Sequence, residues 1–161
     1  MAVTIRPMTG EEFDFFRGCS ANLQAEDLMR VRGISREEAA REAEEDLSRM
    51  LPKGLRTQDN FLMTVENERS ETVGFLWTLH ESSSGRQQSF LCDLLILEPY
   101  RRQGYAAAAL TEMEILAART RCEESVLFVA NHNHAAIGLY QKCGYRLLRQ
   151  MDYGKYMIKR L

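Results

Sequence analysis

The chain has 161 residues, of which 45% are hydrophobic and 27% charged, and its formal net charge is −2. This length suits a single domain, residues 1–161, that can bury a core without help from a metal or a disulfide. The near-neutral charge excludes the strongly basic surface that nucleic-acid-binding and membrane-surface proteins usually carry, so neither partner is expected.

Targeting and redox features point to a cytoplasmic protein. The opening stretch "MAVTIRPMTGEEFDFF" lacks the basic region and apolar core of a signal peptide, and no run approaches the ~18 apolar residues of a membrane span. The four cysteines are far apart and form no Cys-x-x-Cys pair. They therefore indicate reduced thiols rather than a disulfide framework or a zinc site, and no metal is expected.

The first half of the chain predicts a strand, two helices and two further strands. These elements are, in order, Val3–Arg6, Gly10–Met29, Arg36–Met50, Asn60–Glu66 and Glu71–His80. The second helix begins with a capping box, Ser35 followed by Glu38, and stops at Pro52 and Gly54. The last two strands, separated by the polar "NERS", are expected to form an antiparallel hairpin.

The second half predicts alternating strands and helices. The expected elements are a strand at Ser89–Leu97, a helix at Tyr105–Thr120, a strand at Ser125–Ala130, a helix at Asn133–Cys143 and a closing strand pair within Arg146–Leu161. Antiparallel strands followed by a β-α-β-α arrangement predict an α/β fold, with a mixed sheet and helices on both faces.

The stretch "EPYRRQGYAAAAL", residues 98–110, lies where a strand passes into a helix. The first turn of a helix has N–H groups without partners and a positive dipole end, so it attracts phosphate. Gly104 permits an unusual backbone conformation and close approach of a ligand. Arg101 and Arg102 add positive charge. The alternative is that Gly104 is an ordinary turn glycine before a tightly packed alanine-rich helix.

A second segment, "NHNHAAIGLYQKCGY", favours the phosphate-binding interpretation of the loop over the turn-glycine alternative. It reads Asn-x-x-Ala-Ile-x-Leu-Tyr-x-x-x-Gly-Tyr from Asn133 to Tyr145. With the Arg-x-x-Gly-x-Ala loop at 101–106, it resembles the GNAT superfamily of N-acetyltransferases, most closely over Phe90–Arg146, and looks like uncharacterised bacterial members. Ala106 in place of a second glycine is within the family pattern, and Tyr145 stands where Phe is commoner.

The resemblance implies the GNAT fold and acetyl-CoA as the acetyl donor. In that fold a mixed, mostly antiparallel sheet is splayed at its central parallel strands, here Ser89–Leu97 and Ser125–Ala130, and the pantetheine arm pairs with the exposed backbone. The implied cofactor-binding residues are Leu94, Leu95, Ile96, Arg101, Arg102, Gln103, Gly104, Tyr105, Ala106, Ala107, Asn133 and Tyr140. For Asn133 the alternative role is a plain helix N-cap.

The resemblance also implies direct attack of an amine on the thioester. Tyr140 matches the tyrosine that protonates the departing thiolate, and this role is favoured over the alternative of an aromatic ring packed beside Leu139. A backbone N–H near Leu95 or Ile96 is expected to stabilise the developing negative charge. Asp93 is a candidate general base, with ammonium binding and a structural ion pair as alternatives.

The acceptor is expected to be a primary amine of a small molecule or peptide. The acidic helix "SREEAAREAEEDLSRM" offers carboxylates for a polyamine or aminoglycoside, or simply forms a solvated face. A non-catalytic acyl-CoA-binding regulatory module is the alternative function. A nucleotide-binding α/β domain would explain the phosphate loop but not the segment Asn133–Tyr145. Dimers are common in the family, so a homodimer is a further expectation that no segment specifies.

Overall fold

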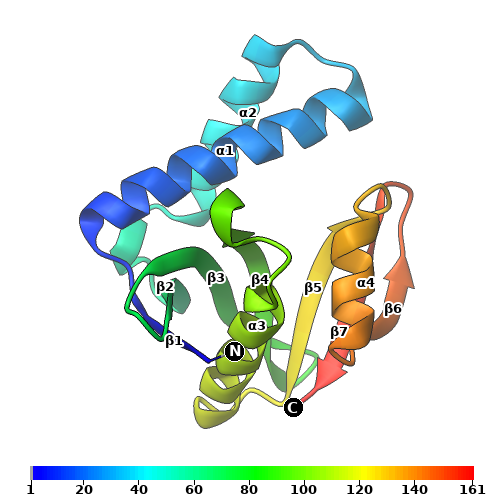
Figure 1. The fold of residues 1–161 in the computed structure, drawn as a ribbon. Helices are drawn as coiled ribbons and strands as arrows, with labels where there is room; N and C mark the ends of the chain where they lie inside the picture. Colours follow the sequence, from blue (N-terminus) through cyan, green and yellow to red (C-terminus); the bar gives the residue numbers. More distant parts are fainter. Residues whose placement is uncertain (1) are drawn as a thin grey trace. The chain divides into compact units, whose positions relative to one another are not determined.

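A computed structural model describes residues 2–161 of the chain (Figure 1). These residues form two compact units, one made of residues 2–7 and 61–161 and the other of residues 8–60. The structure thus contains two compact units, and the single domain expected over residues 1–161 stays a prediction.

The larger unit is built on a seven-stranded sheet of order β1-β2-β3-β4-β5-β7-β6. The strands are β1 Val3–Pro7, β2 Asn60–Asn67, β3 Thr72–Ser83, β4 Arg86–Ile96, β5 Glu124–Ala130, β6 Arg146–Gln150 and β7 Gly154–Arg160. β4 and β5 are parallel, whereas the pairs β1–β2, β3–β4, β5–β7 and β6–β7 are antiparallel. The predicted mixed, mostly antiparallel sheet is confirmed.

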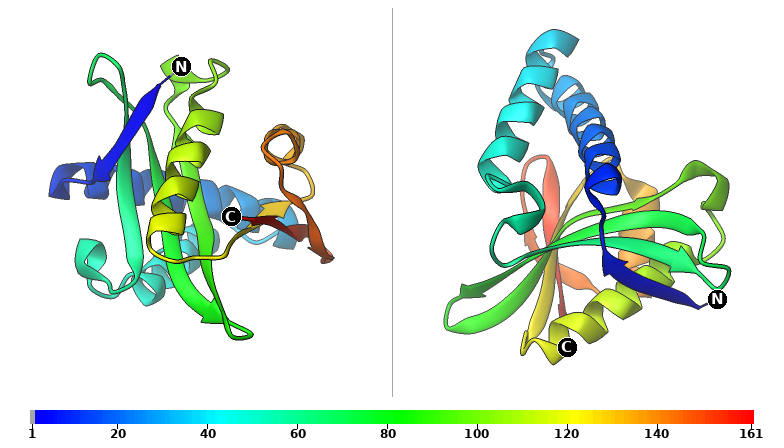
Figure 2. Two further views of the ribbon diagram at one scale, coloured as in Figure 1. Left: turned by 90° about the horizontal axis from the view of Figure 1, so that it is seen from below. Right: turned by 90° about the vertical axis from the view of Figure 1, so that its left-hand side faces the viewer.

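Two helices, α3 Tyr105–Arg119 and α4 His134–Lys142, pack against one buried cluster of the sheet. α3 contributes Ala109, Leu110 and Met113, and its small alanines allow it to lie close along the strands (Figure 2). The facing strand residues include Leu76, Leu91, Leu127 and Met157. They come from β3, β4, β5 and β7, so the cluster spans the centre of the sheet.

The smaller unit contains α1 Gly10–Arg32 and α2 Arg36–Met50, which pack on each other, and a short 3₁₀ turn at Gly54–Arg56. Ser35 Oγ accepts a hydrogen bond from the Glu38 N–H at 3.1 Å, which confirms the N-cap half of the predicted capping box. Within residues 2–161 the Glu38 side chain makes no return bond to the Ser35 N–H, so the box is not complete. The first helix runs three residues beyond its expected end and stops at Gly33, whose φ is 65°.

Three carboxylates of α2 contact side chains of α1, whereas the sequence suggested either a solvated face or an acceptor site for them. Glu42 pairs with Arg32, Glu44 with Arg17, and Asp46 accepts from Gln24 at 2.9 Å. Much of the acidic character of α2 therefore joins the two helices to each other, which favours the structural interpretation of this segment over an acceptor site.

Within residues 2–161, no helix is long and apolar enough to cross a membrane. The same described residues contain no group of three or more His, Cys, Asp or Glu side chains placed to hold a metal ion.

Candidate active site

The central feature of the sheet is the point where β4 and β5 separate. Gln88–Leu91 of β4 pair with Glu124–Leu127 of β5, yet β4 continues to Ile96 and β5 to Ala130. Figure 1 shows the two ribbons diverging beyond this paired part. The splay expected between these strands is confirmed, and it leaves backbone groups of both strands available to a ligand.

A β-bulge bends β4 at the same place. Trp77 of β3 lies opposite Asp93, and Thr78 lies opposite Leu91, so Cys92 is the extra residue. Such an insertion bends a strand and increases its twist. Here it begins directly after the last residue of β4 that pairs with β5, so bulge and splay form one distortion.

The bulge also decides which way the following side chains face. Leu91 and Leu94 both lie on the α3 side, the first in the buried cluster and the second packed against it. Because side chains alternate along a strand, Asp93 and Leu95 face the opposite side. The expected separation of Asp93 and Leu95 from Leu94 and Ile96 is therefore confirmed.

The backbone of β4 presents alternate groups to the splay. The Leu97 N–H donates to the Val73 carbonyl at 2.9 Å, so in this antiparallel ladder the N–H of Leu95 also points to β3. The N–H groups of Leu94 and Ile96 then point to the β5 side. The sequence predicted a backbone N–H donor for the thioester at Leu95 or Ile96. The Ile96 N–H does point to the splay, whereas the Leu95 N–H points to β3. Leu94, whose N–H also points to the splay, is therefore the second candidate donor.

The loop after β4 consists of a 3₁₀ turn at Glu98–Tyr100, residues 101–104, and the start of α3. Gly104 has a φ of 89°, in the left-handed region that glycine tolerates best. A Cβ at Gly104 would meet no atom of the described residues within 4 Å, so none of them occupies this space. Within the described residues, the backbone conformation rather than a steric clash favours glycine here.

The N-terminus of α3 is available to an anion. Among residues 2–161 no side chain caps it, and the first intrahelical bond runs from the Ala108 N–H to the Gly104 carbonyl at 3.1 Å. The N–H groups of Tyr105, Ala106 and Ala107 precede that bond and lie at the positive end of the helix dipole. This arrangement fits the diphosphate of coenzyme A.

Two side chains of the loop, those of Arg101 and Gln103, stabilise it, and cofactor binding by these two residues stays a prediction. Arg101 Nε donates to the Ile96 carbonyl at 2.8 Å, and Gln103 Nε2 donates to the Pro99 carbonyl at 3.0 Å. Both bonds hold the chain that leads into α3. Arg102 is exposed and has a φ of 63°, so it is a second residue of the loop in the left-handed region.

Asn133 caps α4, as its alternative role required. Its Oδ1 accepts from the Ala136 N–H at 3.2 Å. Its Nδ2 donates to no other residue in the part of the chain that the structure describes, so this group remains able to donate to a ligand. The two roles considered for Asn133 are therefore compatible.

Tyr140 packs against the buried cluster, with its ring 5.9 Å from that of Tyr145. Burial raises the pKa of Tyr140 to about 12, and the charges of Asp93 and Cys143 act in the same direction. The phenol is therefore protonated at neutral pH, as a proton donor must be. The structure thus brings Asp93 of β4 and Tyr140 of α4 within electrostatic reach of each other.

A buried polar network below the splay was missed from the sequence. The hydroxyl of Tyr145, a residue that is only 3% exposed, lies 2.7 Å from Ser125 Oγ and 3.5 Å from Glu114 Oε1. Lys159 Nζ lies 2.8 Å from the other oxygen of Glu114. The network joins α3, β5 and β7, and the hydroxyl that distinguishes Tyr145 from the commoner Phe is its centre.

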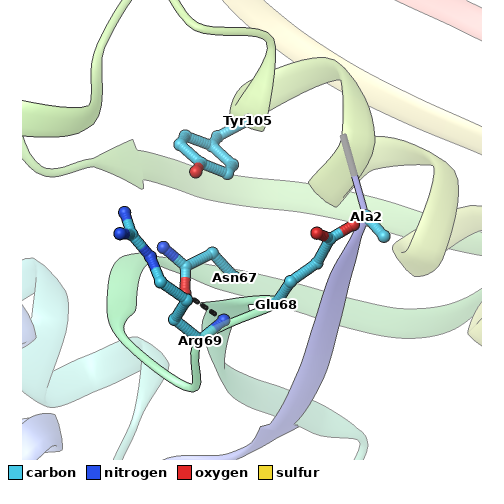
Figure 3. Close-up of a pocket in the computed structure, with 5 residues that line it drawn as sticks. All are labelled: Ala2, Asn67, Glu68, Arg69 and Tyr105. Atoms are coloured by element: carbon cyan, nitrogen blue, oxygen red, sulfur yellow. Dashed lines mark hydrogen bonds between the residues drawn. The ribbon is translucent and has the colours of Figure 1, made fainter.

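A polar pocket of about 370 Å³ borders the start of α3 from the side of the β2–β3 turn (Figure 3). Its lining residues are Ala2, Asn67, Glu68, Arg69 and Tyr105. Arg69 Nε lies 3.4 Å from Glu71, and the Asn67 side chain accepts from the Arg69 N–H at 2.9 Å. The pocket therefore lies beside the turn, not where β4 and β5 diverge.

The comparisons with known proteins agree with this geometry. Residues 24–145 match the model of the Acetyltransferase (GNAT) family. The uncharacterized N-acetyltransferase YdgE of Bacillus subtilis is 30% identical over 147 residues, which cover 91% of this chain and 94% of YdgE. A second protein of that organism, the uncharacterized N-acetyltransferase YycN, is 29% identical over 146 residues, with the same coverage of 91% and 94%.

Solved structures show the same fold. The crystal structure of the putative acetyltransferase YycN aligns with a TM-score of 0.87 and 27% identity, covering 93% of this chain and 96% of that one. The PaiA N-acetyltransferase of Thermoplasma acidophilum, crystallised in complex with coenzyme A, aligns over 100% of both chains with a TM-score of 0.76 and 18% identity.

The chain belongs to the GNAT family of acetyltransferases. It is an N-acetyltransferase that uses acetyl-CoA, and the fold and family inferred from the two sequence motifs are confirmed.

Proposed function

We propose that this enzyme transfers the acetyl group of acetyl-CoA directly to a primary amine of a small molecule or peptide, with Tyr140 as the general acid. The observation that carries the proposal is the position of Tyr140. Its protonated phenol lies within electrostatic reach of Asp93, on the strand whose backbone is exposed by the splay.

The chain supplies two kinds of contact to the cofactor. The N–H groups of the loop Arg102–Ala107 hold the diphosphate at the positive end of α3. The backbone of Leu94 and Ile96 and the Nδ2 of Asn133 bind the pantetheine arm, which extends along the unpaired part of β4. When bound, acetyl-CoA presents a thioester whose carbonyl carbon can be attacked by an amine.

Three groups then act at the thioester. The Ile96 N–H, with that of Leu94 as second donor, stabilises negative charge on the carbonyl oxygen. Asp93 accepts a proton from the incoming amine, directly or through water, and Tyr140 gives its proton to the departing thiolate. The non-catalytic regulatory module is not favoured, because the family match and the relatives named as N-acetyltransferases support acetyl transfer.

The test is thiol release from acetyl-CoA in the presence of a panel of primary amines, short peptides and aminoglycosides. Replacement Tyr140→Phe is expected to lower kcat by roughly 10²–10⁴-fold, the usual contribution of a general acid, with little change in KM for acetyl-CoA. Tyr153→Phe is the matched control, because Tyr153 is 61% exposed in the β6–β7 turn.

Two results would count against this proposal. Full activity of Tyr140→Phe would remove Tyr140 from the chemistry. Saturable coenzyme A binding without transfer to any amine of the panel would revive the regulatory module. A cytoplasmic location and a homodimer remain predictions.

A further inference from the structure

Three aromatic side chains form a row across β4, β5 and β7. They are Phe90, Phe128 and Tyr156, which we call the aromatic row. The ring of Tyr156 lies 5.1 Å from that of Phe128 and 6.4 Å from that of Phe90, with interplanar angles of 63° and 60°. Such edge-on contacts are favourable arrangements for aromatic rings.

The aromatic row lies on the face of the sheet opposite α3. Leu91, Leu127 and Met157, each adjacent in sequence to a member of the row, all belong to the buried cluster under α3. Strand side chains alternate between faces, so Phe90, Phe128 and Tyr156 point the other way. Asp93 shares that face, because the bulge at Cys92 reverses the alternation between Leu91 and Leu94.

Phe128 is both exposed and held in place. It is 44% exposed, although it belongs to a central strand. A Cβ at Gly154 would lie 2.4 Å from Phe128 Cζ and 2.6 Å from the Val129 carbonyl oxygen, so the ring rests directly on the backbone of β7. A fixed aromatic ring that faces solvent is a suitable surface for an apolar ligand.

Negative charge lies on the β4 side of the same region. The carboxylates of Asp93 and Glu81 are both close enough to the Cys92 thiol to contribute to its raised pKa, which burial alone already lifts. Glu81 also accepts from Gln88 Nε2 at 3.0 Å. The splay is therefore flanked by a carboxylate, Asp93, on β4 and by an exposed aromatic ring, Phe128, on β5.

We propose that the aromatic row is the acceptor subsite, and that it selects a primary amine carrying an apolar alkyl or aryl group. The inference rests on the proposed transfer to an amine. The apolar group lies on Phe128 and Tyr156, while the amine nitrogen is directed toward Asp93 and the thioester. A second ammonium group at the far end of the acceptor would lose hydration over the aromatic row, away from Asp93. The weak attraction of an exposed ring for a cation recovers less than an apolar contact of that end would contribute.

Two probes of equal length test the proposal. n-Hexylamine and 1,5-diaminopentane have the same number of heavy atoms and differ only in a terminal methyl or ammonium group. The value of kcat/KM is expected to be higher for n-hexylamine by roughly tenfold or more, as contacts of an apolar pocket usually allow. In Phe128→Ala this ratio should fall close to one, with KM for acetyl-CoA unchanged.

The controls separate a specific contact from a general loss of structure. Phe128→Leu keeps an apolar surface and should recover most of the preference for n-hexylamine. Leu148→Ala removes another exposed apolar side chain, 52% exposed on β6, and should leave the ratio of the two probes unchanged. A preference for the diamine, or a preference for n-hexylamine that Phe128→Ala leaves intact, would overturn the proposal.

Binding distinguishes this inference from the proposed function. If neither probe is acetylated, calorimetry with n-hexylamine on the coenzyme A-loaded protein still tests the subsite. Binding that weakens roughly tenfold in Phe128→Ala would uphold the subsite, even though the transfer proposal had failed. Transfer to other amines, with no measurable n-hexylamine binding, would overturn the subsite and leave the transfer proposal standing.

Discussion

Gly104 and Gly85 have similar backbone conformations in very different surroundings. Their φ angles are 89° and 77°, and a Cβ at either position would meet no atom of residues 2–161 within 4 Å. Gly104 is the N-cap residue of α3, whereas Gly85 lies in the turn between β3 and β4. The pair therefore separates the energetic cost of the backbone conformation from any contribution to cofactor binding.

Replacing either glycine by alanine is expected to cost about 1–2 kcal/mol of stability, the penalty of a left-handed conformation for a residue with a Cβ. Only Gly104→Ala should also raise KM for acetyl-CoA, by roughly tenfold or more, because its new methyl group lies where the diphosphate approaches. Urea unfolding and steady-state kinetics on both variants check this. Equal KM values in the two variants would exclude a role of Gly104 in cofactor binding.

The raised pKa of Tyr140 predicts a stability change at alkaline pH. In the unfolded chain the phenol ionises near pH 10, whereas in the folded protein its pKa is about 12. The folded state therefore retains a proton that the unfolded state has lost, so stability is intact below pH 10 and decreases as the pH rises toward 12. The decrease attributable to this residue is on the order of 2 kcal/mol.

Urea unfolding of wild type and Tyr140→Phe at pH 9, 10 and 11 measures this change. The variant should lose less stability over the interval than wild type does, while Tyr153→Phe should behave like wild type. Parallel curves for wild type and Tyr140→Phe would show that the phenol does not hold its proton more tightly in the folded state.

Some residues of the candidate active site could be predicted from the sequence, and others could not. The loop glycine and the Asn133–Tyr145 segment stand at fixed spacings, so they could be found without a structure. The hydrogen bonds of the Arg101 and Gln103 side chains to backbone carbonyls could not be found from the sequence, because they depend on how the 3₁₀ turn at Glu98–Tyr100 folds back. Charge alone suggested phosphate contacts for Arg101.

Between elements, the Tyr145 network has a measurable energetic signature. Tyr145→Phe leaves the fully buried Ser125 hydroxyl without its closest partner, which should cost about 1–3 kcal/mol. Ser125→Ala should cost a similar amount, and the double variant should cost clearly less than the sum of the two. Unfolding free energies of the four proteins complete this cycle, and simple additivity would show that the two hydroxyls do not stabilise each other.

Element types were predictable, since helix caps, apolar periodicity and turn residues are local signals. The N-cap at Ser35 and the strand Ser125–Ala130 show this, with the strand starting only one residue early, at Glu124. The bulge at Cys92 was not predictable, because a bulge is a mismatch between two strands. The residues around Cys92 do not indicate that Leu91 and Asp93, which are separated by Cys92, will lie opposite two consecutive residues of β3.

At the scale of the whole molecule, the chain leaves the sheet after β1, forms α1 and α2, and returns at β2, which lies beside β1 in the sheet. Residues 8–60 are thus an insertion between neighbouring strands. A helical unit of this size buries little apolar surface and is marginal on its own. The acidic residues of α2 did not indicate, from the sequence, that residues 8–60 would form a separate compact unit.

We therefore expect residues 1–161 to unfold in one cooperative transition. Differential scanning calorimetry should give a calorimetric enthalpy equal to the van't Hoff enthalpy, and coenzyme A should raise Tm without splitting the peak. An earlier, separate transition with loss of helical circular dichroism would show that residues 8–60 melt independently.

The extra residue in β4 divides this strand into two parts whose side chains alternate between the faces of the sheet in opposite phase. Up to Leu91 the side chains follow one alternation, and from Asp93 onward they follow the other, with Cys92 marking the change of phase. Anyone who transplants the segment Asp93–Leu97 into another scaffold, or recombines homologous genes within this strand, must therefore carry Cys92 along with its opposite neighbours Trp77 and Thr78. A graft that omits Cys92 would place the Asp93 carboxylate on the opposite face of the recipient sheet, although every residue of Asp93–Leu97 had been kept.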